Sequence, residues 1–348
     1  MAAAMAMTAD DAHSMTTITW SDESGRPTRE LRECLVAATA APSIHNTQPW
    51  LFRPHNDTID VLVDRRRQLR ALDPSGREMF VSVGAALLNL RLALRSHGHQ
   101  TKVLLMPDHD QPDLAARVSI DGPADASEHV LALYEAIPRR HTNRRPFADR
   151  PVPFATLEEL AGAATAEGAA MLTVDSGLRD GVLSLTRTAE TQMRTDPRYR
   201  AELAAWTTPG GVGRRDGVPR QAFGPRDTDG ALPLRDFAHG HGAPTATVAF
   251  EPDPTVILLF TDRDTRVDWL RAGAALQRVL LTATLRGLAG TPLSQLLEVP
   301  KLRALLVDSL TGEVAQTVLR IGYPITPAVA TPRRPVGEVV VRWGEPAS

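Results

Sequence analysis

The amino-acid sequence predicts an α+β protein made of two related halves that are fused in one chain. Two observations indicate this fold class. A helical segment near residue 77 is repeated about 190 residues later, and strand-like and helix-like segments are mixed throughout both halves. With 348 residues, the chain is long enough for two domain-sized units.

The repeat has a constant offset of 189 residues. Its matched positions are Asp73 with Asp262, Arg77 with Arg266, Phe80 with Trp269, Gly84–Leu87 with Gly273–Leu276, and Gly98 with Gly287. Each copy predicts an N-capped helix that ends at a glycine. The alternative is two unrelated helices that share common residue types, but the matched Asp, Arg and aromatic residues favour duplication.

The other elements follow from apolar periodicity and from turn residues between the segments. Strands are expected at Trp50–Arg53 and Thr58–Val63, on either side of a turn at Pro54–Asp57, and at Thr101–Leu105, Ala115–Ile120, Ala170–Val174, Thr255–Phe260, Val314–Gly322 and Val336–Trp343. Further helices are expected at Thr28–Ala40, Ser127–Ile137, Thr156–Ala166, Gly177–Met193 and Pro300–Ser309.

These elements divide the chain into an N-terminal extension (residues 1–27), a first half (28–137) and a second half (138–348). The extension lacks the basic start and apolar run of a secretory signal, and Met15 is a second candidate for the natural start. Residues 207–243 contain eight glycines and four prolines with little apolar periodicity. Such a long insertion is expected to be either a lid or a surface loop, and Trp206 and Phe223 are candidate anchors for a lid.

Composition excludes several classes of function. The formal net charge is −2, so no global field favours nucleic acid or an anionic membrane. The sequence shows no run of about 18 apolar residues, and we expect a cytoplasmic protein that does not span a membrane. The single cysteine, Cys34, excludes an internal disulfide, and its apolar surroundings predict a buried, inert thiol.

Two motifs carry the chemistry. Ala41–Trp50 reads Ala-Pro-Ser-Ile-His-Asn-Thr-Gln-Pro-Trp and offers small polar groups and carboxamides suited to the edge of a planar heterocycle. Arg139–Phe147 reads Arg-Arg-His-Thr-Asn-Arg-Arg-Pro-Phe and clusters guanidinium groups suited to a phosphate monoester. FMN combines a flat polar ring with a phosphate. The alternatives are a Pro-bounded turn for the first motif and a solvated basic turn for the second.

These two segments resemble the FMN-contacting signatures of the nitroreductase family, and the whole chain from about residue 28 to 343 is similar to its Acg-like branch. The resemblance implies a nitroreductase-like fold in which two duplicated α/β sandwich halves form an intramolecular pseudo-dimer. Only the first half carries the Pro-Ser-x-x-Asn signature, and only the second carries the Arg-His-Thr-Asn-Arg cluster. We therefore expect one FMN per chain, and a monomer or a weak homodimer.

The resemblance also implies which residues bind the cofactor. Pro42, Ser43, Ile44, Asn46 and Gln48 would come from the first motif, with the first four along the isoalloxazine ring. Arg140, His141, Thr142 and Arg144 would come from the second motif, and the guanidinium groups of Arg140 and Arg144 would serve the phosphate and the N1–O2 edge. The family places backbone amides near the ring in a loop that here contains Pro292, Leu293 and Ser294, and a basic pair near the phosphate that corresponds to Arg333 and Arg334.

Other motifs are weaker. His97 and His99, like His239 and His241, flank a glycine and are interpreted as turn residues, so we predict no metal site. The sequence has no Gly-x-Gly-x-x-Gly fingerprint after a strand, which argues against a separate dinucleotide-binding domain. No nucleophile–base constellation is evident, so we assign no catalytic side chain, and the flavin would carry the hydride chemistry.

The leading functional hypothesis is an FMN oxidoreductase that takes hydride from NAD(P)H or from a substrate. Its acceptor would be a small electron-poor molecule such as a nitroaromatic or a quinone. One alternative is a flavin-sequestering or storage protein whose lid suppresses turnover. Another is a substrate-specific biosynthetic flavin dehydrogenase or dehalogenase.

Overall fold

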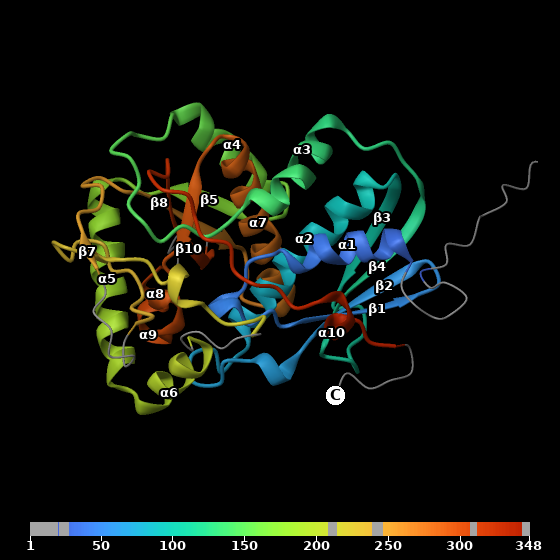
Figure 1. Ribbon diagram of the computed structural model, residues 1–348, viewed down its shortest axis with the longest axis horizontal. Coiled ribbons are helices and arrows are strands. Elements are labelled where there is room, and N and C mark those ends of the chain that lie inside the picture. The colour runs from blue at the N-terminus through green and yellow to red at the C-terminus, as the bar shows by residue number, and fades with distance from the viewer. Residues whose placement is uncertain (1–19, 21–27, 208–213, 239–245, 307–311, 343–348) are drawn as a thin grey trace, which may run out of the picture.

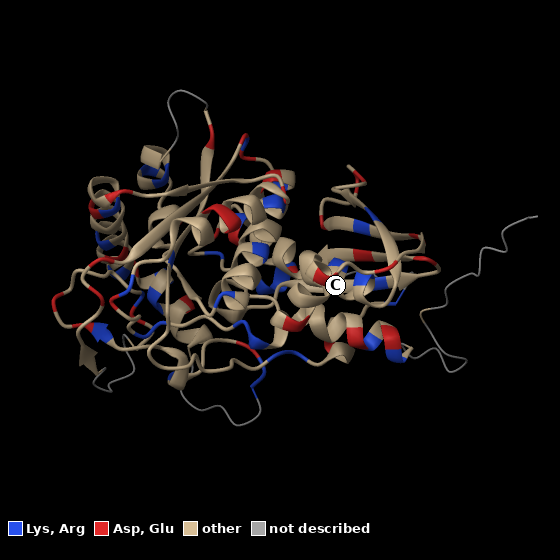
Figure 2. Ribbon diagram, turned by 90° about the horizontal axis from the view of Figure 1, so that it is seen from above, with Lys and Arg blue, Asp and Glu red and all other residues tan. Residues whose placement is uncertain are grey.

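We describe a computed structural model of the chain, which covers residue 20 and residues 28–207, 214–238, 246–306 and 312–342. Two four-stranded antiparallel sheets lie toward opposite sides of the molecule, with helices α2 and α7 between them (Figure 1). The predicted α+β class is therefore confirmed. Lys and Arg residues are interspersed with Asp and Glu along the ribbon (Figure 2), as the nearly neutral net charge implies.

The first sheet has the strand order β1-β2-β4-β3. Its strands are β1 Trp50–His55, β2 Thr58–Val63, β3 His99–Leu105 and β4 Leu114–Pro123, and its helices are α1 Arg29–Thr39, α2 Arg77–Ser96 and α3 Glu128–Ala136. The Thr28 hydroxyl accepts the N–H of Leu31 and caps α1. The β1–β2 turn is shorter than predicted, because Pro54 continues β1 and only Asn56 and Asp57 form the turn.

The second sheet has the order β5-β8-β10-β9. Its strands are β5 Ala170–Thr173, β8 Thr255–Thr261, β9 Ala289–Pro292 and β10 Val314–Gly322. The helices that follow residue 137 are α4 Phe154–Thr165, α5 Ser176–Thr195, α6 Pro197–Trp206, α7 Arg266–Leu285, α8 Gln295–Glu298 and α9 Pro300–Arg303. The helix predicted over Pro300–Ser309 is thus a single turn followed by a 3₁₀ turn at Ala304–Leu306, and its last residues lie outside the described part.

Helices α2 and α7 form the centre of the molecule. Each is 20 residues long, and their first residues lie 189 positions apart. A Cβ atom on Gly84 would lie 2.1 Å from the Leu270 carbonyl oxygen, and one on Gly273 would lie 1.9 Å from that of Val81. The helices approach so closely because both crossing residues lack a side chain. Leu270 and other α7 residues belong to the same apolar cluster as α1, α2 and the first sheet.

Helix α2 is long and apolar enough to cross a membrane by length and composition alone. However, 83% of its most apolar window is buried inside the protein, as is usual for a core helix. Cys34 of α1 is a buried free thiol, and burial, followed by the charges of Glu30 and Glu33, raises its pKa to about 12. The prediction of a buried thiol is confirmed.

Residues 214–238 pack against α5, α6 and the loop before α2. Their apolar side chains join one cluster with partners from these elements, and its buried members are Leu69, Leu72, Ala189, Met193, Tyr199, Leu203, Val218, Phe223, Phe237 and Val299. A two-stranded parallel ribbon joins this segment to the chain before β8, with β6 at Arg226–Asp227 and β7 at Thr247–Val248. The described part of the predicted insertion is thus anchored by buried aromatic rings.

The prediction of a strand over Val336–Trp343 is wrong for residues 336–339, and Trp343 lies outside the described residues. The chain instead forms a single turn of helix, α10 Val336–Val339, on the first half of the molecule (Figure 1). Pro335 precedes the turn, the Arg334 guanidinium donates to the Glu338 carbonyl at 2.7 Å, and Val339 is buried in the first core. Only the end of the segment keeps strand character, where the Val341 N–H donates to the Phe52 carbonyl at 2.9 Å.

Candidate functional site

The first motif forms a tight turn between α1 and β1. Three of its non-glycine residues have positive φ angles: His45 (47°), Asn46 (55°) and Gln48 (51°). Such residues are uncommon and concentrate at binding sites. The Ser43 hydroxyl accepts the Gln48 N–H at 2.9 Å, and the Ser82 hydroxyl of α2 accepts the Ile44 N–H at 3.2 Å. These bonds fix the turn against α2.

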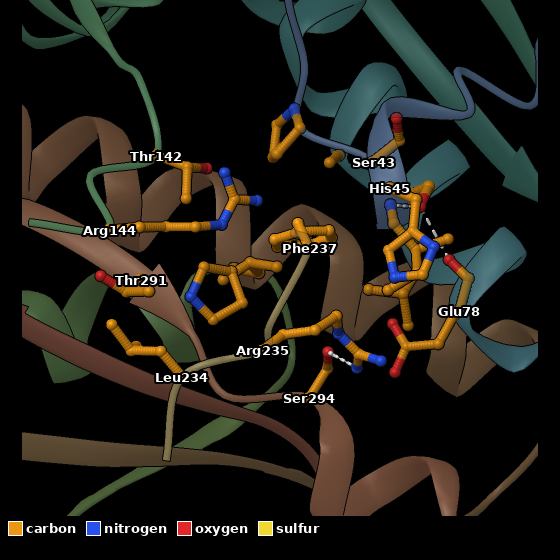
Figure 3. A pocket seen from close by; sticks show the side chains of 17 residues that line it. Ser43, His45, Glu78, Thr142, Arg144, Leu234, Arg235, Phe237, Thr291 and Ser294 are labelled. Carbon is orange, nitrogen blue, oxygen red and sulfur yellow. Dashed lines mark hydrogen bonds between the residues drawn. The ribbon is translucent and has the colours of Figure 1, made fainter. Parts of the chain in front are cut away.

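This turn forms one wall of a cavity, here called the cofactor cavity (Figure 3). The other walls come from α2, α7, the second motif, the end of β9 and residues 234–237. The lining residues are Pro42, Ser43, Ile44, His45, Glu78, Val81, Ser82, Ala85, Thr142, Arg144, Leu234, Arg235, Phe237, Leu276, Thr291, Pro292 and Ser294. Segments more than 240 residues apart in the sequence thus meet at one site.

Half of the residues predicted to bind a cofactor line this cavity: Pro42, Ser43, Ile44, Thr142, Arg144, Pro292 and Ser294. The others do not: Asn46, Gln48, Arg140, His141, Leu293, Arg333 and Arg334. Leu293 packs in the core of the second half, and its N–H donates to the Val318 carbonyl at 2.9 Å. The cofactor roles of all fourteen residues stay predictions.

Arg140, which is buried, and Arg333, which is half-buried, form a cationic pair close to the first motif. A terminal nitrogen of each guanidinium donates to the Ala40 carbonyl at 3.2 Å, so the two side chains converge on one atom. The Nε atoms of both are buried without a hydrogen-bond partner, and within the described residues neither side chain forms an ion pair. Burial and the charge of Arg333 lower the pKa of Arg140 to about 9, and burial lowers that of Arg333 to about 10.

A protein gains no stability from a buried and a half-buried cation that both lack an ion-pair partner, so this pair is suited to an anion. His141 lies beside it and is half-buried, and its pKa is lowered by burial and by the charges of Arg140 and Arg333. Arg334, the other member of the predicted C-terminal pair, is differently placed. It lies 3.7 Å from the Asp64 carboxylate and donates to the Gln48 carbonyl at 3.1 Å.

Arg144 extends into the cofactor cavity from the second motif (Figure 3). Its guanidinium donates to the Ala222 carbonyl at 2.9 Å and lies 4.7 Å from the centre of the Phe237 ring. Burial and the nearby charge of Arg235 lower its pKa to about 10. At neutral pH, Arg144 therefore presents a positive charge to the cavity.

Asn46 and Gln48 hold two distant segments against the first motif. The Asn46 carboxamide donates to the carbonyls of Gly217 at 2.9 Å and Pro332 at 3.1 Å. Gln48 donates to the Arg215 carbonyl at 2.8 Å and accepts the Arg334 N–H at 2.8 Å. Both motif carboxamides thus connect the insertion and the C-terminal segment to the turn.

Four ionisable or aromatic cavity residues were not predicted from the sequence: His45, Glu78, Arg235 and Phe237. Arg235 is buried and donates to both Glu298 oxygens at 2.6 Å and to the Tyr199 hydroxyl at 2.6 Å. Neither ring nitrogen of His45 has a hydrogen-bond partner. Burial, with the charges of Arg235 and Arg144, lowers the His45 pKa well below its usual value, so the imidazole is neutral.

Of these residues, Glu78 could have been found from the sequence, but Arg235 and Phe237 could not. Glu78 breaks the repeat, because the equivalent position, Val267, is apolar, and a carboxyl group on a buried helix face is a recognisable anomaly. Arg235 and Phe237 have no such signal, since tertiary packing alone brings them to the cavity. Within the described residues, no group of three or more His, Cys, Asp or Glu side chains is arranged for a metal, and His239 and His241 lie outside these residues.

Comparisons with known proteins give the family of the chain. A model of the nitroreductase family matches residues 137–323. A Mycobacterium tuberculosis protein provisionally named NAD(P)H nitroreductase Rv3131 is 37% identical over 325 residues, which span 90% of this chain and 92% of that protein. The provisionally named NAD(P)H nitroreductase acg of the same organism is 31% identical over 316 residues, spanning 89% and 94% of the two chains.

Solved structures show a more distant likeness. The FMN-dependent nitroreductase NfnB from Mycobacterium smegmatis in complex with NADPH is 19% identical, with a TM-score of 0.37, and the match covers 63% of this chain and all of that one.

Proposed function

Because the chain belongs to the nitroreductase family, we propose that it is an FMN-dependent oxidoreductase that takes electrons from NAD(P)H. Its acceptor is a small electron-poor molecule such as a nitroaromatic or a quinone. The observation that carries the proposal is the unpaired Arg140–Arg333 pair, which lies next to a cavity walled by both sequence motifs.

The residues present fit FMN. The unpartnered Nε atoms of Arg140 and Arg333 can donate to a phosphate, which would also neutralise the buried charges. The cavity offers Thr142, Arg144 and the Pro42–Ile44 turn to a planar ring with a polar edge. Bound FMN would supply the hydride chemistry, and the positive charge of Arg144 would favour an anionic reduced ring. The protein's own task is to bind, orient and exclude water.

The fold also supports our proposal that the chain is a fused pseudo-dimer with a single FMN. When the sheet strands are numbered by their order within each half, both sheets have the order 1-2-4-3, with the long helix between the second and third strands. The reciprocal contacts of Gly84 with Leu270 and of Gly273 with Val81 relate the two helices by a local two-fold axis. The complementary loss of one motif from each half leaves one complete site per chain, so the protein would act as a monomer.

Flavin content and reduction test the function directly. The purified protein should show a flavin absorbance band at one FMN per chain, and anaerobic addition of NADPH should bleach it. A protein that binds no flavin, or two per chain, would contradict the proposal. Bleaching by one biosynthetic substrate but not by NAD(P)H would favour the dehydrogenase alternative.

A second candidate function, flavin sequestration, is favoured by one specific observation. Leu234, Arg235 and Phe237 of the insertion contribute to the wall of the cofactor cavity, and Asn46 holds Gly217 of the same insertion. A closed wall at this position would keep nicotinamide from the ring. The same NADPH experiment separates the two functions, because a storage protein would bind FMN fully and be reduced slowly or not at all.

A further inference from the structure

Glu78 lies between two cavities. It lines the cofactor cavity and also a second cavity, here called the outer cavity, whose polar lining residues include Asp73, Arg77, Glu298 and Arg303. Among the lining residues described for the two cavities, Glu78 is the one that they share. The side chain stands in the first turn of α2, where Figure 3 shows its carboxylate facing the cofactor cavity near His45 and Arg235.

The surroundings of Glu78 place the pKa of its carboxyl group near neutral pH. Burial raises its pKa to about 7, and the nearby carboxylates of Glu298 and Asp73 act in the same direction. Arg77, whose guanidinium contacts the Glu78 carboxylate, and Arg303 act in the opposite direction. A carboxyl group poised near the working pH is well suited to general acid catalysis.

The other ionisable groups of the cofactor cavity are poor proton donors at neutral pH. Arg144 and Arg235 stay protonated, and neutral His45 would have to become an imidazolate. His45 can still donate a hydrogen bond, since both of its ring nitrogens are unpartnered. Glu78 is therefore the one ionisable group among the described cavity-lining residues that can release and regain a proton in this range.

We propose that Glu78 is the proton donor for the reduction of the acceptor, and that it regains its proton from solvent through the outer cavity. This inference rests on the proposed function. A quinone or other carbonyl acceptor that takes a hydride, with its two electrons, from the reduced flavin must also take one proton on oxygen. Glu78 supplies that proton by breaking its O–H bond, and it becomes a carboxylate until solvent reprotonates it.

The test compares Glu78→Gln with the wild-type protein after anaerobic reduction. Gln has the same shape but cannot release a proton. We expect oxidation of the reduced variant by menadione, a quinone, to slow by about a hundredfold, the lower range for loss of a general acid. Oxidation by ferricyanide should be unchanged, because ferricyanide takes single electrons without protons. Glu78→Asp should restore part of the menadione rate.

A matched control and a second readout complete the test. Glu190 is another buried glutamate with a raised pKa, but it lines neither of these two cavities, so Glu190→Gln should keep both rates. Infrared difference spectra should show a protonated carboxyl that titrates near neutral pH in the wild type and in Glu190→Gln, but not in Glu78→Gln.

Three results would overturn the assignment: an unchanged menadione rate in Glu78→Gln, equal slowing with ferricyanide, or loss of FMN from that variant. The last two would place Glu78 in flavin binding or in folding. A wild-type protein without FMN would instead contradict the proposed function itself.

Discussion

Gly84 and Gly273 occupy reciprocal positions at the crossing of the two central helices, each facing a backbone carbonyl of the other helix. Each helix supplies one glycine and one carbonyl, so neither can take a side chain without moving its partner. The crossing connects the first apolar core to the second half of the chain. Close packing at these two residues therefore couples the stability of the two halves.

We expect Gly84→Ala and Gly273→Ala to destabilise the protein by similar amounts. Overpacking in a rigid core costs about 1–3 kcal/mol, which exceeds the gain of up to about 1 kcal/mol in helix propensity. Urea unfolding measures the difference. Gly181→Ala in α5 is the control, because no atom lies within 4 Å of its added Cβ, and it should be neutral or stabilising. Equal effects at all three sites would refute the close crossing.

The Arg140–Arg333 pair predicts opposite effects on binding and stability. Arg140→Met should weaken FMN binding by about ten- to a hundredfold, since a charge-assisted hydrogen bond is worth roughly 1.5–3 kcal/mol. It should leave riboflavin binding unchanged, because riboflavin has no phosphate. The flavin-free variant should be at least as stable as the wild type, since an unpaired buried charge is removed.

Fluorescence titration with both flavins and thermal unfolding of the flavin-free proteins provide these measurements. Arg139→Met, at the exposed neighbouring arginine, is the control and should change neither. If Arg140→Met weakens FMN and riboflavin equally, the pair does not bind the phosphate.

Strand bounds could be predicted from the sequence where the local residue pattern favours the same structure as the packing around the segment. The bounds of Thr58–Val63 and Val314–Gly322 match the structure, because both segments are buried along nearly their whole length and are rich in β-branched residues. The described part of the predicted Val336–Trp343 strand, residues 336–342, has a similar composition, but among the described residues it has a single bridge to β1, between Val340 and Phe52. Here a single helical turn buries Val339 completely.

In the candidate site too, residues in short local motifs could be predicted from the sequence, whereas residues placed by tertiary packing could not. Pro42–Ile44 and Thr142–Arg144 are short contiguous motifs, and the structure brings both to the cavity. Arg235 and Phe237 come from an insertion with no periodic pattern, and their positions depend on packing against Tyr199, Glu298 and Phe223. No local rule connects these residues to a turn about 190 positions earlier in the chain.

Gln48 is expected to hold the C-terminal segment in place. Gln48→Ala would leave the Arg334 N–H and the Arg215 carbonyl without their buried partner, at a cost of about 1–3 kcal/mol for each unsatisfied group. Hydrogen exchange should become faster at residues 332–341 and 214–218. Gln295→Ala is the matched control, because this buried carboxamide donates to Pro233 and its loss should affect residues 229–234 instead. Unchanged exchange at residues 332–341 in Gln48→Ala would contradict this role.

The raised pKa of Glu78 makes stability depend on pH. Between its usual value of 4.5 and its folded value of about 7, the folded state binds more protons than the unfolded state. The stabilisation is therefore complete below about 4.5 and is lost as the pH rises through about 7. Relative to Glu78→Gln, the wild type should lose up to about 3 kcal/mol over this window, at roughly 1.4 kcal/mol per pKa unit. The free energy of unfolding of both proteins is measured with urea as a function of pH. If the difference between them stays constant over this pH window, the raised pKa of Glu78 is contradicted.

Phe237 provides the sharpest test of whether the insertion restricts access to the cofactor. Its ring stacks on Phe223 at 6.0 Å and meets the edge of His45 at 5.5 Å, so it closes part of the cavity wall from the insertion side. Hydride transfer requires the donor to lie within about 3–3.5 Å of the acceptor atom, and a closed wall prevents this approach. We expect Phe237→Ala to speed anaerobic bleaching by NADPH without releasing FMN, provided that the variant retains a cooperative melt. Phe154→Ala, which removes a ring that is 73% exposed on α4, should have no effect. If the wild type is bleached as fast as Phe237→Ala, the wall is no barrier and sequestration loses its structural support.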